Sequence, residues 1–367
     1  MSFYAKYSEV KNTPFEQMFS NIRPEDVQRA LDKPQLNEFD FAALLSPAAE
    51  TFVEAMSQKA QQVTRKYFGH VMQLFAPLYI SDYCVNRCEY CGFSVNHDFP
   101  RRKLTLLEIE EEGKAIAKTG IQNLLLVTGE SRQHVSIPYL KESVSVLKKY
   151  FSTIAIEIQP LKTEEYQDLV EFGIDGLTVH QETYNEEIYK RLHVKGPKRN
   201  YAYRLDTPER GCCAGMRTVY IGALLGLDDW RKEAFFTGLH AQYLQQMYSK
   251  TEIGIAFPRM RPHLGEFQPA VDVTDQNLVQ IILATRLFLP KAGMTLSTRE
   301  RPAFREKLIH FGITKMSAAS STAVGGYANK QESHSQFEIS DERSVDEVVT
   351  MLKKYGYVPI CREATAL

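Results

Sequence analysis

The segment APLYISDYCVNRCEYCGFSVNH, residues 76–97, joins a short apolar run to three closely spaced cysteines, Cys84, Cys88 and Cys91. The apolar run has the length and composition of a buried β-strand, and the cysteines follow it at its carboxyl end. In a parallel barrel, the carboxyl ends of the strands form the face that carries the active site. The segment therefore predicts a strand that delivers three thiolates to such a face.

Three thiolates from one loop suit two kinds of metal site. A structural zinc ion requires four closed ligands, so zinc would have to recruit His97, or Cys212 and Cys213, and the protein would be a zinc-stabilised scaffold. A 4Fe-4S cluster has four irons, and three thiolates would leave one iron open for a substrate or cofactor. The spacing favours the cluster, with zinc kept as the alternative.

Seven further apolar runs follow the first, separated by segments with helical patterns. The eight runs occupy residues 76–83, 123–129, 153–159, 176–181, 217–226, 251–258, 294–299 and 314–320. Helix starts between or after them are marked by capping boxes from Thr105 to Glu108 and from Ser344 to Glu347, and by Pro138 in a first turn. This alternation predicts an α/β fold, a TIM-type (β/α)8 barrel, although a doubly wound sheet would give a similar pattern.

The segments on either side of the barrel pattern differ from it. Residues 1–75 have a helical pattern without a strand, with Pro24 at the start of one helix and Gly69 at the end of a long amphipathic one. We therefore predict an N-terminal helical extension over 1–75 and the barrel over 76–320. Residues 321–367 are predicted to be a loop, a helix and a short extended segment that pack on the barrel.

Polar side chains occur at the carboxyl ends of nearly all the predicted strands. In strand order they are Cys84; Thr128 and Glu130; Glu157 and Gln159; Gln181 and Glu182; Arg259 and Arg261; Arg299; and Ser317 and Ser320. In a barrel these ends converge on one face, so the polar groups would line a single mouth.

The composition narrows the possible partners and surroundings. Apolar residues make up 44% and charged residues 24% of the 367 residues, which is typical of a globular protein. The net charge of -1 does not show the excess of positive charge that is typical of proteins that bind nucleic acid or an anionic membrane. A signal peptide and an apolar run of about 18 residues are both missing from the sequence, which predicts a cytoplasmic protein with no membrane segment.

The cysteine spacing, with Tyr90 directly before the third cysteine, resembles the signature of the radical S-adenosylmethionine (SAM) enzymes. This resemblance implies a 4Fe-4S cluster on the three cysteines, whose open iron binds SAM, and a 5'-deoxyadenosyl radical made by cleavage of SAM. It also implies SAM contacts further along the chain. These are Tyr90 beside the cluster; Thr128, Gly129 and Glu130 at the ammonium group; Glu182 at the ribose; Arg204 at the carboxylate; and Gly222, with Gly226, near adenine.

A set of longer motifs resembles the aromatic amino acid lyases among these enzymes, and most closely the tyrosine lyases (2-iminoacetate synthases) of thiamine thiazole synthesis. The motifs are LLSPAAE, PLYISDYCVNRCEYCGFS, LLLVTGE, EIQPL, QETY, FPRMRP, LSTRE and GGYA, and they extend over nearly the whole chain. The resemblance implies cleavage of the Cα–Cβ bond of L-tyrosine to 2-iminoacetate (dehydroglycine) and p-cresol. It further implies thiazole synthase ThiG as a partner and a flavodoxin or ferredoxin as electron donor.

Three residues are assigned to the substrate on this resemblance and on their positions at strands. Arg299 would hold the substrate carboxylate by two parallel hydrogen bonds, Ser317 would be a second donor, and Tyr79 would lie near the substrate amino group. A tryptophan lyase stays open, because tryptophan shares the backbone of tyrosine and differs in the ring. A sulfur insertion enzyme like biotin synthase would need ligands for a second cluster, and only Cys212 and Cys213 form a spare pair.

Other candidates have simpler explanations. Adjacent cysteines at 212 and 213 would lie on different faces of a helix and are poorly placed to share a ligand. His180 is expected to be a strand histidine with its hydrogen bonds satisfied. Asp228 and Asp229 are expected to begin a helix.

Overall fold

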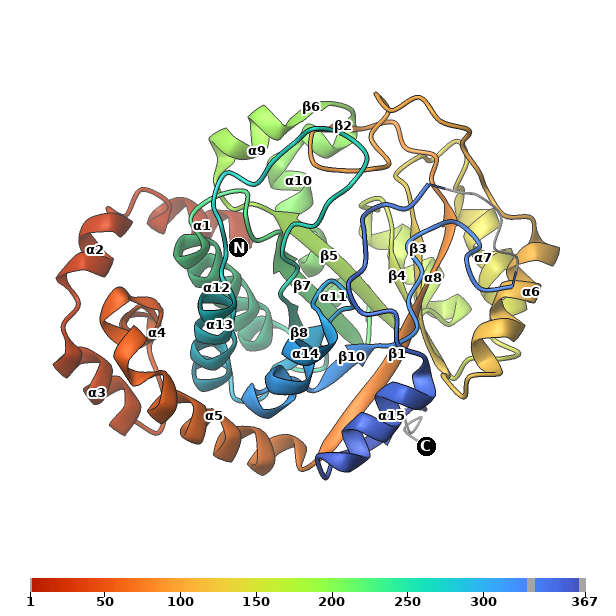
Figure 1. Ribbon diagram of the computed structural model, residues 1–367. Coiled ribbons are helices and arrows are strands. Elements are labelled where there is room, and N and C mark those ends of the chain that lie inside the picture. The colour runs from red at the N-terminus through yellow and green to blue at the C-terminus, as the bar shows by residue number, and fades with distance from the viewer. Residues whose placement is uncertain (1, 329–333, 363–367) are drawn as a thin grey trace.

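The computed structural model of the chain describes residues 2–328 and 334–362. Its first part is helical, as the sequence predicts. The elements are α1 Phe3–Val10, α2 Phe15–Asn21, α3 Pro24–Asp32, α4 Glu38–Leu45, η1 Pro47–Phe52 and α5 Val53–Phe68. Pro24 is the first residue of α3, and Gly69 ends α5 with φ 61°, a conformation that favours glycine. These helices curve around one side of the molecule (Figure 1).

Eight parallel strands form the barrel. They are β1 Val71–Ser81, β3 Asn123–Thr128, β4 Thr153–Glu157, β5 Gly176–Glu182, β7 Thr218–Ala223, β8 Glu252–Ala256, β9 Gly293–Leu296 and β10 Lys315–Ser317. They pair in chain order, and β10 pairs with β1, which closes the sheet. The predicted barrel is confirmed, and the doubly wound alternative is wrong because such a sheet stays open. The prediction of no strand before residue 75 is also wrong, because β1 begins at Val71.

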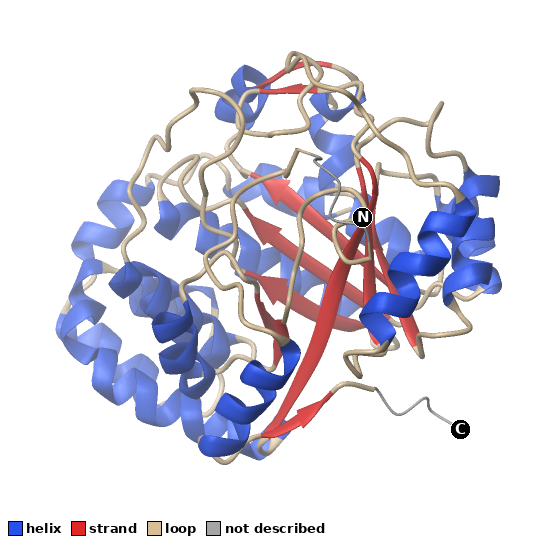
Figure 2. Ribbon diagram, turned by 45° about the vertical axis from the view of Figure 1, so that its right-hand side comes forward, coloured by secondary structure: helices blue, strands red, loops and turns tan. Residues whose placement is uncertain are grey.

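Helices surround the strands, which lie in the centre of the molecule (Figure 2). They are α6 Leu106–Ala117, α7 Ile137–Leu147, α8 Thr163–Phe172, α11 Thr207–Cys213, α12 Trp230–Met247, α13 Asp275–Phe288, α14 Pro302–Leu308 and the short η3 Ile309–Phe311. Thr105 and Glu108 form the predicted capping box of α6, and Asp229 caps α12 by accepting from two backbone N–H groups. The N-terminal extension packs on this layer, where Phe41 of α4 stacks on Phe288 of α13 with ring centroids 4.3 Å apart.

The interior of the barrel contains a cavity of about 190 Å³. Ile156 and Ile221 face the helices and are fully buried, whereas alternate positions line the cavity. Phe75, Tyr79 and Tyr220 are large side chains of this lining. A Cβ on Gly254 of the next strand would lie 2.2 Å from the Tyr220 ring, and one on Gly293 would lie 2.6 Å from its hydroxyl. Two glycines therefore make the space that Tyr220 occupies, and the rest of the lumen is left for a ligand.

A second layer lies over the carboxyl ends of the strands. It contains β2 Arg87–Cys88, α9 Glu186–Leu192, β6 His193–Lys195, η2 Pro197–Arg199 and α10 Tyr201–Leu205, at the top of Figure 1. At the end of the chain, α15 Val345–Lys354 and β11 Val358–Ile360 provide the predicted helix and extended segment, and β11 pairs with the start of β1. Residues 329–333 and 363–367 of the predicted C-terminal segment lie outside the described residues.

Candidate active site

The cysteine loop is held in shape by hydrogen bonds to its backbone. Cys88 lies on β2, which pairs with His193 on β6, and the N–H of Val85 donates to the carbonyl oxygen of Glu130 at 3.1 Å. Arg101 reaches into the loop from its far end. Its guanidinium donates to the carbonyl oxygens of Asp82, Phe93, Ser94 and His97 at 2.6 to 3.1 Å. The protein alone therefore fixes the backbone that carries the three cysteines.

The three thiols form a donor set that fits a cubic iron-sulfur cluster. Burial raises the pKa of each thiol, to about 11 for Cys84, and the pKa of Cys88 is lowered by the charge of Lys198 and raised by those of Cys91 and Cys84. Within residues 2–328 and 334–362, no three His, Cys, Asp or Glu side chains are arranged to hold a single metal ion. A cubic cluster instead takes its thiolates on separate irons. Protons must leave these thiols when iron binds, because thiolate is the ligand form.

The partners that a zinc site would need point elsewhere. The His97 ring lies beside Gly265, whose added Cβ would be 2.9 Å from it. Cys212 is buried on α11, and the adjacent Cys213 is exposed and donates to the Tyr248 hydroxyl at 3.4 Å. The two cysteines thus lie on different faces of the helix, as predicted.

Tyr90, directly before the third cysteine, is fixed by a chain of hydrogen bonds. Its hydroxyl lies 2.6 Å from Nε2 of His193, and Nδ1 of His193 lies 2.7 Å from the carbonyl oxygen of Tyr189. Since only a protonated Nδ1 can donate to a carbonyl, Nε2 accepts from Tyr90 and the imidazole is neutral. Burial, reinforced by the charge of Lys198, lowers the pKa of His193 to about 3, which agrees with the neutral form.

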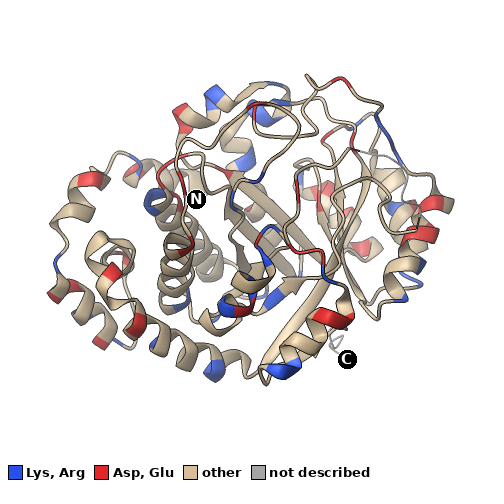
Figure 3. Ribbon diagram, viewed as in Figure 1, with Lys and Arg blue, Asp and Glu red and all other residues tan. Residues whose placement is uncertain are grey.

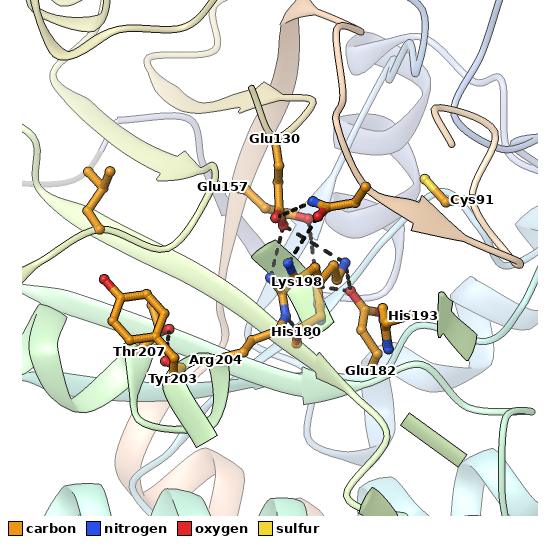
Figure 4. Close-up of polar contacts among 12 residues, drawn as sticks. Cys91, Glu130, Glu157, His180, Glu182, His193, Lys198, Tyr203, Arg204 and Thr207 are labelled. Carbon is orange, nitrogen blue, oxygen red and sulfur yellow. Dashed lines mark hydrogen bonds and ion pairs between the residues drawn. The ribbon is translucent and has the colours of Figure 1, made fainter. Parts of the chain in front are cut away.

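Two carboxylates and two cations meet beside the cysteine loop, as Figure 4 shows. Glu130 accepts from Arg204 at 2.9 Å and from Asn86 at 2.8 Å. Glu182 accepts from Lys198 at 2.7 Å and from Arg204 at 3.3 Å. Arg204 also donates through Nε to the carbonyl oxygen of His180 at 2.8 Å. We call Glu130, Glu182, Lys198 and Arg204 the charge quartet, and its formal charges cancel.

Glu182 shows how strongly the charge quartet acts on its members. Burial by itself raises the pKa of Glu182, but the charges of Lys198 and Arg204 outweigh it and hold the pKa at about 2. In turn, the carboxylates raise the pKa values of Lys198 and Arg204, although burial and mutual repulsion lower them. Glu182 also has φ 74°, which is uncommon for a residue with a side chain. Glu182, Lys198 and Arg204 are therefore ionised at neutral pH.

Thr128, Gly129 and Gly222 lie where the backbone is closely packed. The hydroxyl of Thr128 is buried without a hydrogen-bond partner in the described structure. A Cβ on Gly129 would lie 2.5 Å from the carbonyl oxygen of Tyr83, and one on Gly222 would lie 2.4 Å from that of Ala256. Backbone packing therefore requires glycine at both positions. The unpartnered hydroxyl of Thr128, two residues before Glu130, fits a polar group of a ligand such as SAM.

On the opposite side of the cavity, Arg299 is half-buried and has no carboxylate partner in the described part of the chain. Its guanidinium donates to the carbonyl oxygen of Arg259 at 3.2 Å and lies over the Phe337 ring at 3.4 Å. Burial lowers the pKa of Arg299, against the raising effects of Tyr79 and Glu157. Arginine stays charged in proteins, so the site holds a cation that an anionic ligand could pair.

Tyr79 and Ser317 line the same cavity as Arg299, together with Cys91, Tyr90 and Glu182. The hydroxyl of Tyr79 donates to Oε1 of Gln336 at 2.8 Å, and the Ser317 hydroxyl accepts from the N–H of Thr298 at 3.1 Å. Nε2 of Gln336 lies 3.9 Å from Sγ of Cys91. Gln336 therefore joins the cysteine loop to the side of the cavity that holds Arg299.

Two of the other strand-end residues have different surroundings. The prediction of a satisfied His180 is wrong, because the ring lines the cavity and its Nδ1 is buried without a hydrogen-bond partner in the described residues. Its polar edge is aimed into the lumen rather than into the core. Arg259 is a bracing residue, since it pairs with Glu300 and with Asp275 at 3.0 Å.

The sequence reasoning missed Lys198 and Gln336. Lys198 belongs to η2, which lies beyond the predicted strand end. The basic run 195–199, which follows the QETY motif, was the sequence feature that could have indicated it. Gln336 lies in the C-terminal segment, where the chain returns across the barrel mouth, and no local pattern marks it. Both positions depend on contacts between segments far apart in the chain.

This barrel and its cysteine loop are those of a radical SAM enzyme. The model of the radical SAM superfamily matches residues 78–236, and that of the Biotin and Thiamin Synthesis associated domain matches residues 256–358. Two curated 2-iminoacetate synthases match over 339 residues, which are 92% of this chain and 90% of each relative. They are from Escherichia coli (strain K12), at 41% identity, and Salmonella typhimurium, at 40%. The chain belongs to the 2-iminoacetate synthase family, and its cofactors are a 4Fe-4S cluster and SAM.

Solved structures share the fold. HydG, a maturase of the [FeFe]-hydrogenase, superposes with a TM-score of 0.89 at 30% identity over 95% of this chain and 80% of that chain. Methylornithine synthase superposes with a TM-score of 0.74 at 22% identity over 91% of this chain and 97% of that chain. No helix among the described residues is both long and apolar enough to cross a membrane.

Proposed function

We propose that this chain is a tyrosine lyase that cleaves the Cα–Cβ bond of L-tyrosine to 2-iminoacetate and p-cresol, for thiamine thiazole synthesis. The observation that carries the proposal is the half-buried guanidinium of Arg299, without a carboxylate partner in the described part of the chain, in a cavity that is also lined by Cys91. An amino acid substrate supplies the missing carboxylate. The name of the curated relatives, 2-iminoacetate synthase, supports the product.

The cofactors would be held on the side of the charge quartet. Cys84, Cys88 and Cys91 would ligate the cluster, and Glu130 and Thr128 would meet the ammonium group of SAM. When bound, the cluster and SAM together supply a carbon radical that can remove a hydrogen atom from a substrate. Glu182 is ionised at every pH above about 2, so its carboxylate oxygens remain available as acceptors for the ribose hydroxyls.

The substrate would be held on the side of Arg299. Two parallel hydrogen bonds from a guanidinium fix both position and orientation of a carboxylate, so Arg299 would direct the substrate amino group toward the cofactors. Ser317 would donate its hydroxyl proton to the same carboxylate, because its oxygen already accepts from Thr298. Tyr79 would place its hydroxyl near the amino group, braced by Gln336.

The proposed reaction needs an electron donor and a protein that receives its product. The enzyme would receive single electrons from a flavodoxin or ferredoxin in the cytoplasm, where both carriers and thiamine synthesis occur. The product 2-iminoacetate hydrolyses in water to glyoxylate, so direct delivery to thiazole synthase ThiG would protect it.

The test is an anaerobic incubation of the reconstituted holoenzyme with SAM, dithionite and either L-tyrosine or L-tryptophan. We expect p-cresol and glyoxylate from tyrosine, and no cleavage of tryptophan. Cys88→Ala, treated identically, controls for chemistry that does not depend on the cluster. Cleavage of tryptophan in preference to tyrosine would overturn the substrate assignment, and SAM cleavage without either product would overturn the lyase.

A further inference from the structure

One electron must reach the cysteine loop from outside in each reductive step, and the loop is exposed at Val85 and at Val95. Val85, directly after Cys84, has 43% of its surface exposed. Cys88 lies on β2, and the partner strand β6 carries the exposed Val194 and Lys195. Electron transfer falls steeply with distance, so a carrier must dock where cluster ligands lie just beneath the surface.

The surface over the loop has an apolar centre. Val85, Val95 and Val194 are 43%, 44% and 38% exposed. Val95 lies close to Val85, since its N–H donates to the carbonyl oxygen of Asn86, the residue after Val85, at 3.0 Å. A cavity of about 250 Å³ opens beside Val85 and is lined in part by Pro160, Pro197 and Tyr203. Exposed apolar groups gathered in one area mark a place of contact with another protein.

Basic side chains surround this centre. Lys190, Arg191, Lys195 and Arg199 are all exposed, and none of them forms an ion pair or a side-chain hydrogen bond within the described residues. Figure 3 shows Lys and Arg on α9 and the segment after it, at the top of the molecule. We call these four residues with Val85, Val95 and Val194 the carrier surface.

Acidic groups also lie near the carrier surface, and Asp98, three residues after Val95, is exposed. Glu186 binds Lys11 at 2.8 Å, and Glu89 binds Arg87 at 3.1 Å. Glu187, at the start of α9, is exposed. The whole chain has a net charge of -1, so the positive charge here is local and not a property of the protein as a whole.

We infer that the carrier surface is the docking site of an acidic one-electron carrier protein. The carrier would lose one electron and the cluster would gain it, with no other reactant. This role rests on the proposed function, because only a redox cluster in the cysteine loop needs a carrier. Complementary charge speeds the encounter, while the apolar centre excludes water from the contact above Cys84 and Cys88.

The experiment measures electron transfer rather than lyase turnover. Holoenzyme with an oxidised cluster is mixed anaerobically with purified flavodoxin hydroquinone, without tyrosine, and the loss of cluster absorbance is followed by stopped flow. For Lys195→Glu with Arg199→Glu, we expect the second-order rate constant to fall about tenfold or more at ~0.01 M ionic strength. The difference should shrink near ~1 M, where surface charges are screened. Reduction by dithionite should be unchanged.

A matched control carries the same change of charge at the other end of the barrel. Lys250→Glu with Lys291→Glu alters two exposed lysines that precede β8 and β9, so it should leave the flavodoxin rate within about twofold of the original. Lys195→Gln with Arg199→Gln should show a smaller loss in the same direction, and it guards against misassembly of the first variant. Electron paramagnetic resonance of the dithionite-reduced forms verifies that all variants hold the cluster.

The result would overturn the inference if the two Glu variants slowed flavodoxin equally, or if the rate with unaltered enzyme did not fall with salt. A failure of the lyase assignment would look different. In that case flavodoxin would still reduce the cluster in the charge-dependent manner described, while tyrosine remained uncleaved.

Discussion

On the cysteine-loop side of the cavity, Glu130 and Glu182 meet Lys198 and Arg204 in a network whose charges cancel, whereas on the opposite side Arg299 has no carboxylate partner in the described residues. Both regions are buried and polar. They differ in whether the protein itself supplies the opposite charge. The charges of the charge quartet are balanced without a ligand, whereas the charge of Arg299 is not.

This difference teaches what each side requires from its ligand. The amino acid end of SAM carries one ammonium and one carboxylate group, so these two groups can exchange partners within the neutral charge quartet without adding net charge there. An uncompensated cation in a buried site costs stability, and a ligand carboxylate relieves that cost on binding. The first side is therefore built for the stability and orientation of its groups, and the second for affinity toward an anion.

The largest expected effect comes from removing one thiolate. Cys88→Ala should abolish both the cluster and the cleavage of SAM, because two remaining thiolates cannot hold the cube. Iron and sulfide content and visible absorbance of the anaerobically reconstituted protein measure this loss. Cys213→Ala, which alters an exposed cysteine on α11, should retain the cluster and full SAM cleavage. Cluster retention by Cys88→Ala would remove the cysteine loop from the site.

The sequence predicted the two sides unequally, and the reason is physical. The resemblance to radical SAM enzymes predicted the cysteine loop, Thr128–Glu130 and Glu182 at or just after strand ends, and the barrel brings these ends together. Arg299 was predicted from the same resemblance and from its place at a strand end, and the ligand roles of all these residues stay predictions. Lys198 and Gln336 were missed because their positions depend on η2 and on the C-terminal segment, which fold over the mouth through contacts distant in sequence. The open space around His180 could not be predicted either, because it depends on which neighbouring strands carry glycine.

The next largest effect tests the charge quartet. Lys198→Met removes one cation and leaves Glu182 buried with Arg204 as its remaining ion-pair partner, so we expect the free energy of unfolding to fall by about 3 kcal/mol at pH 7. Urea unfolding of the protein without cofactors measures this change. Lys198→Arg keeps the charge and should lose less than half as much. Equal stability of the Met variant and the original would show that the charge quartet is not a stabilising network.

Arg299→Met is the matched substitution on the other side, and its effects should be of the opposite kind. Because the cation has no carboxylate partner there, we expect the free energy of unfolding to stay the same or rise. The KM for tyrosine should rise about 100-fold, since the charged hydrogen bonds to the carboxylate contribute about 2–3 kcal/mol. Arg301→Met, at an exposed arginine, serves as the control. A loss of stability equal to that of Lys198→Met would break the distinction between the two sides.

The smallest expected effect concerns another buried carboxylate close to the charge quartet, Glu233, which has no ion-pair partner within residues 2–328 and 334–362. Glu233 accepts from the Thr183 hydroxyl at 2.6 Å and from the Tyr184 N–H, directly after Glu182. Burial raises its pKa from 4.5 to about 8, with Asp228 and Asp229 adding to the shift, whereas the pKa of Glu182 is about 2. The pKa values of Glu182 and Glu233 thus differ because only Glu182 has Lys198 and Arg204 as ion-pair partners.

The raised pKa of Glu233 fixes the sign of a pH effect. The folded state holds a proton that the unfolded state loses near pH 4.5, so this stability is complete below pH 4.5 and is lost as the pH rises to about 8. Between those values the group should lower the free energy of unfolding by about 1.4 kcal/mol per pH unit. Glu233→Gln mimics the neutral carboxyl group, so urea unfolding from pH 7 to 8 should show a shallower slope than the original protein. Glu187→Gln, on the exposed start of α9, should keep the original slope, and parallel slopes for all three proteins would mean that Glu233 is ionised in the folded state despite its burial.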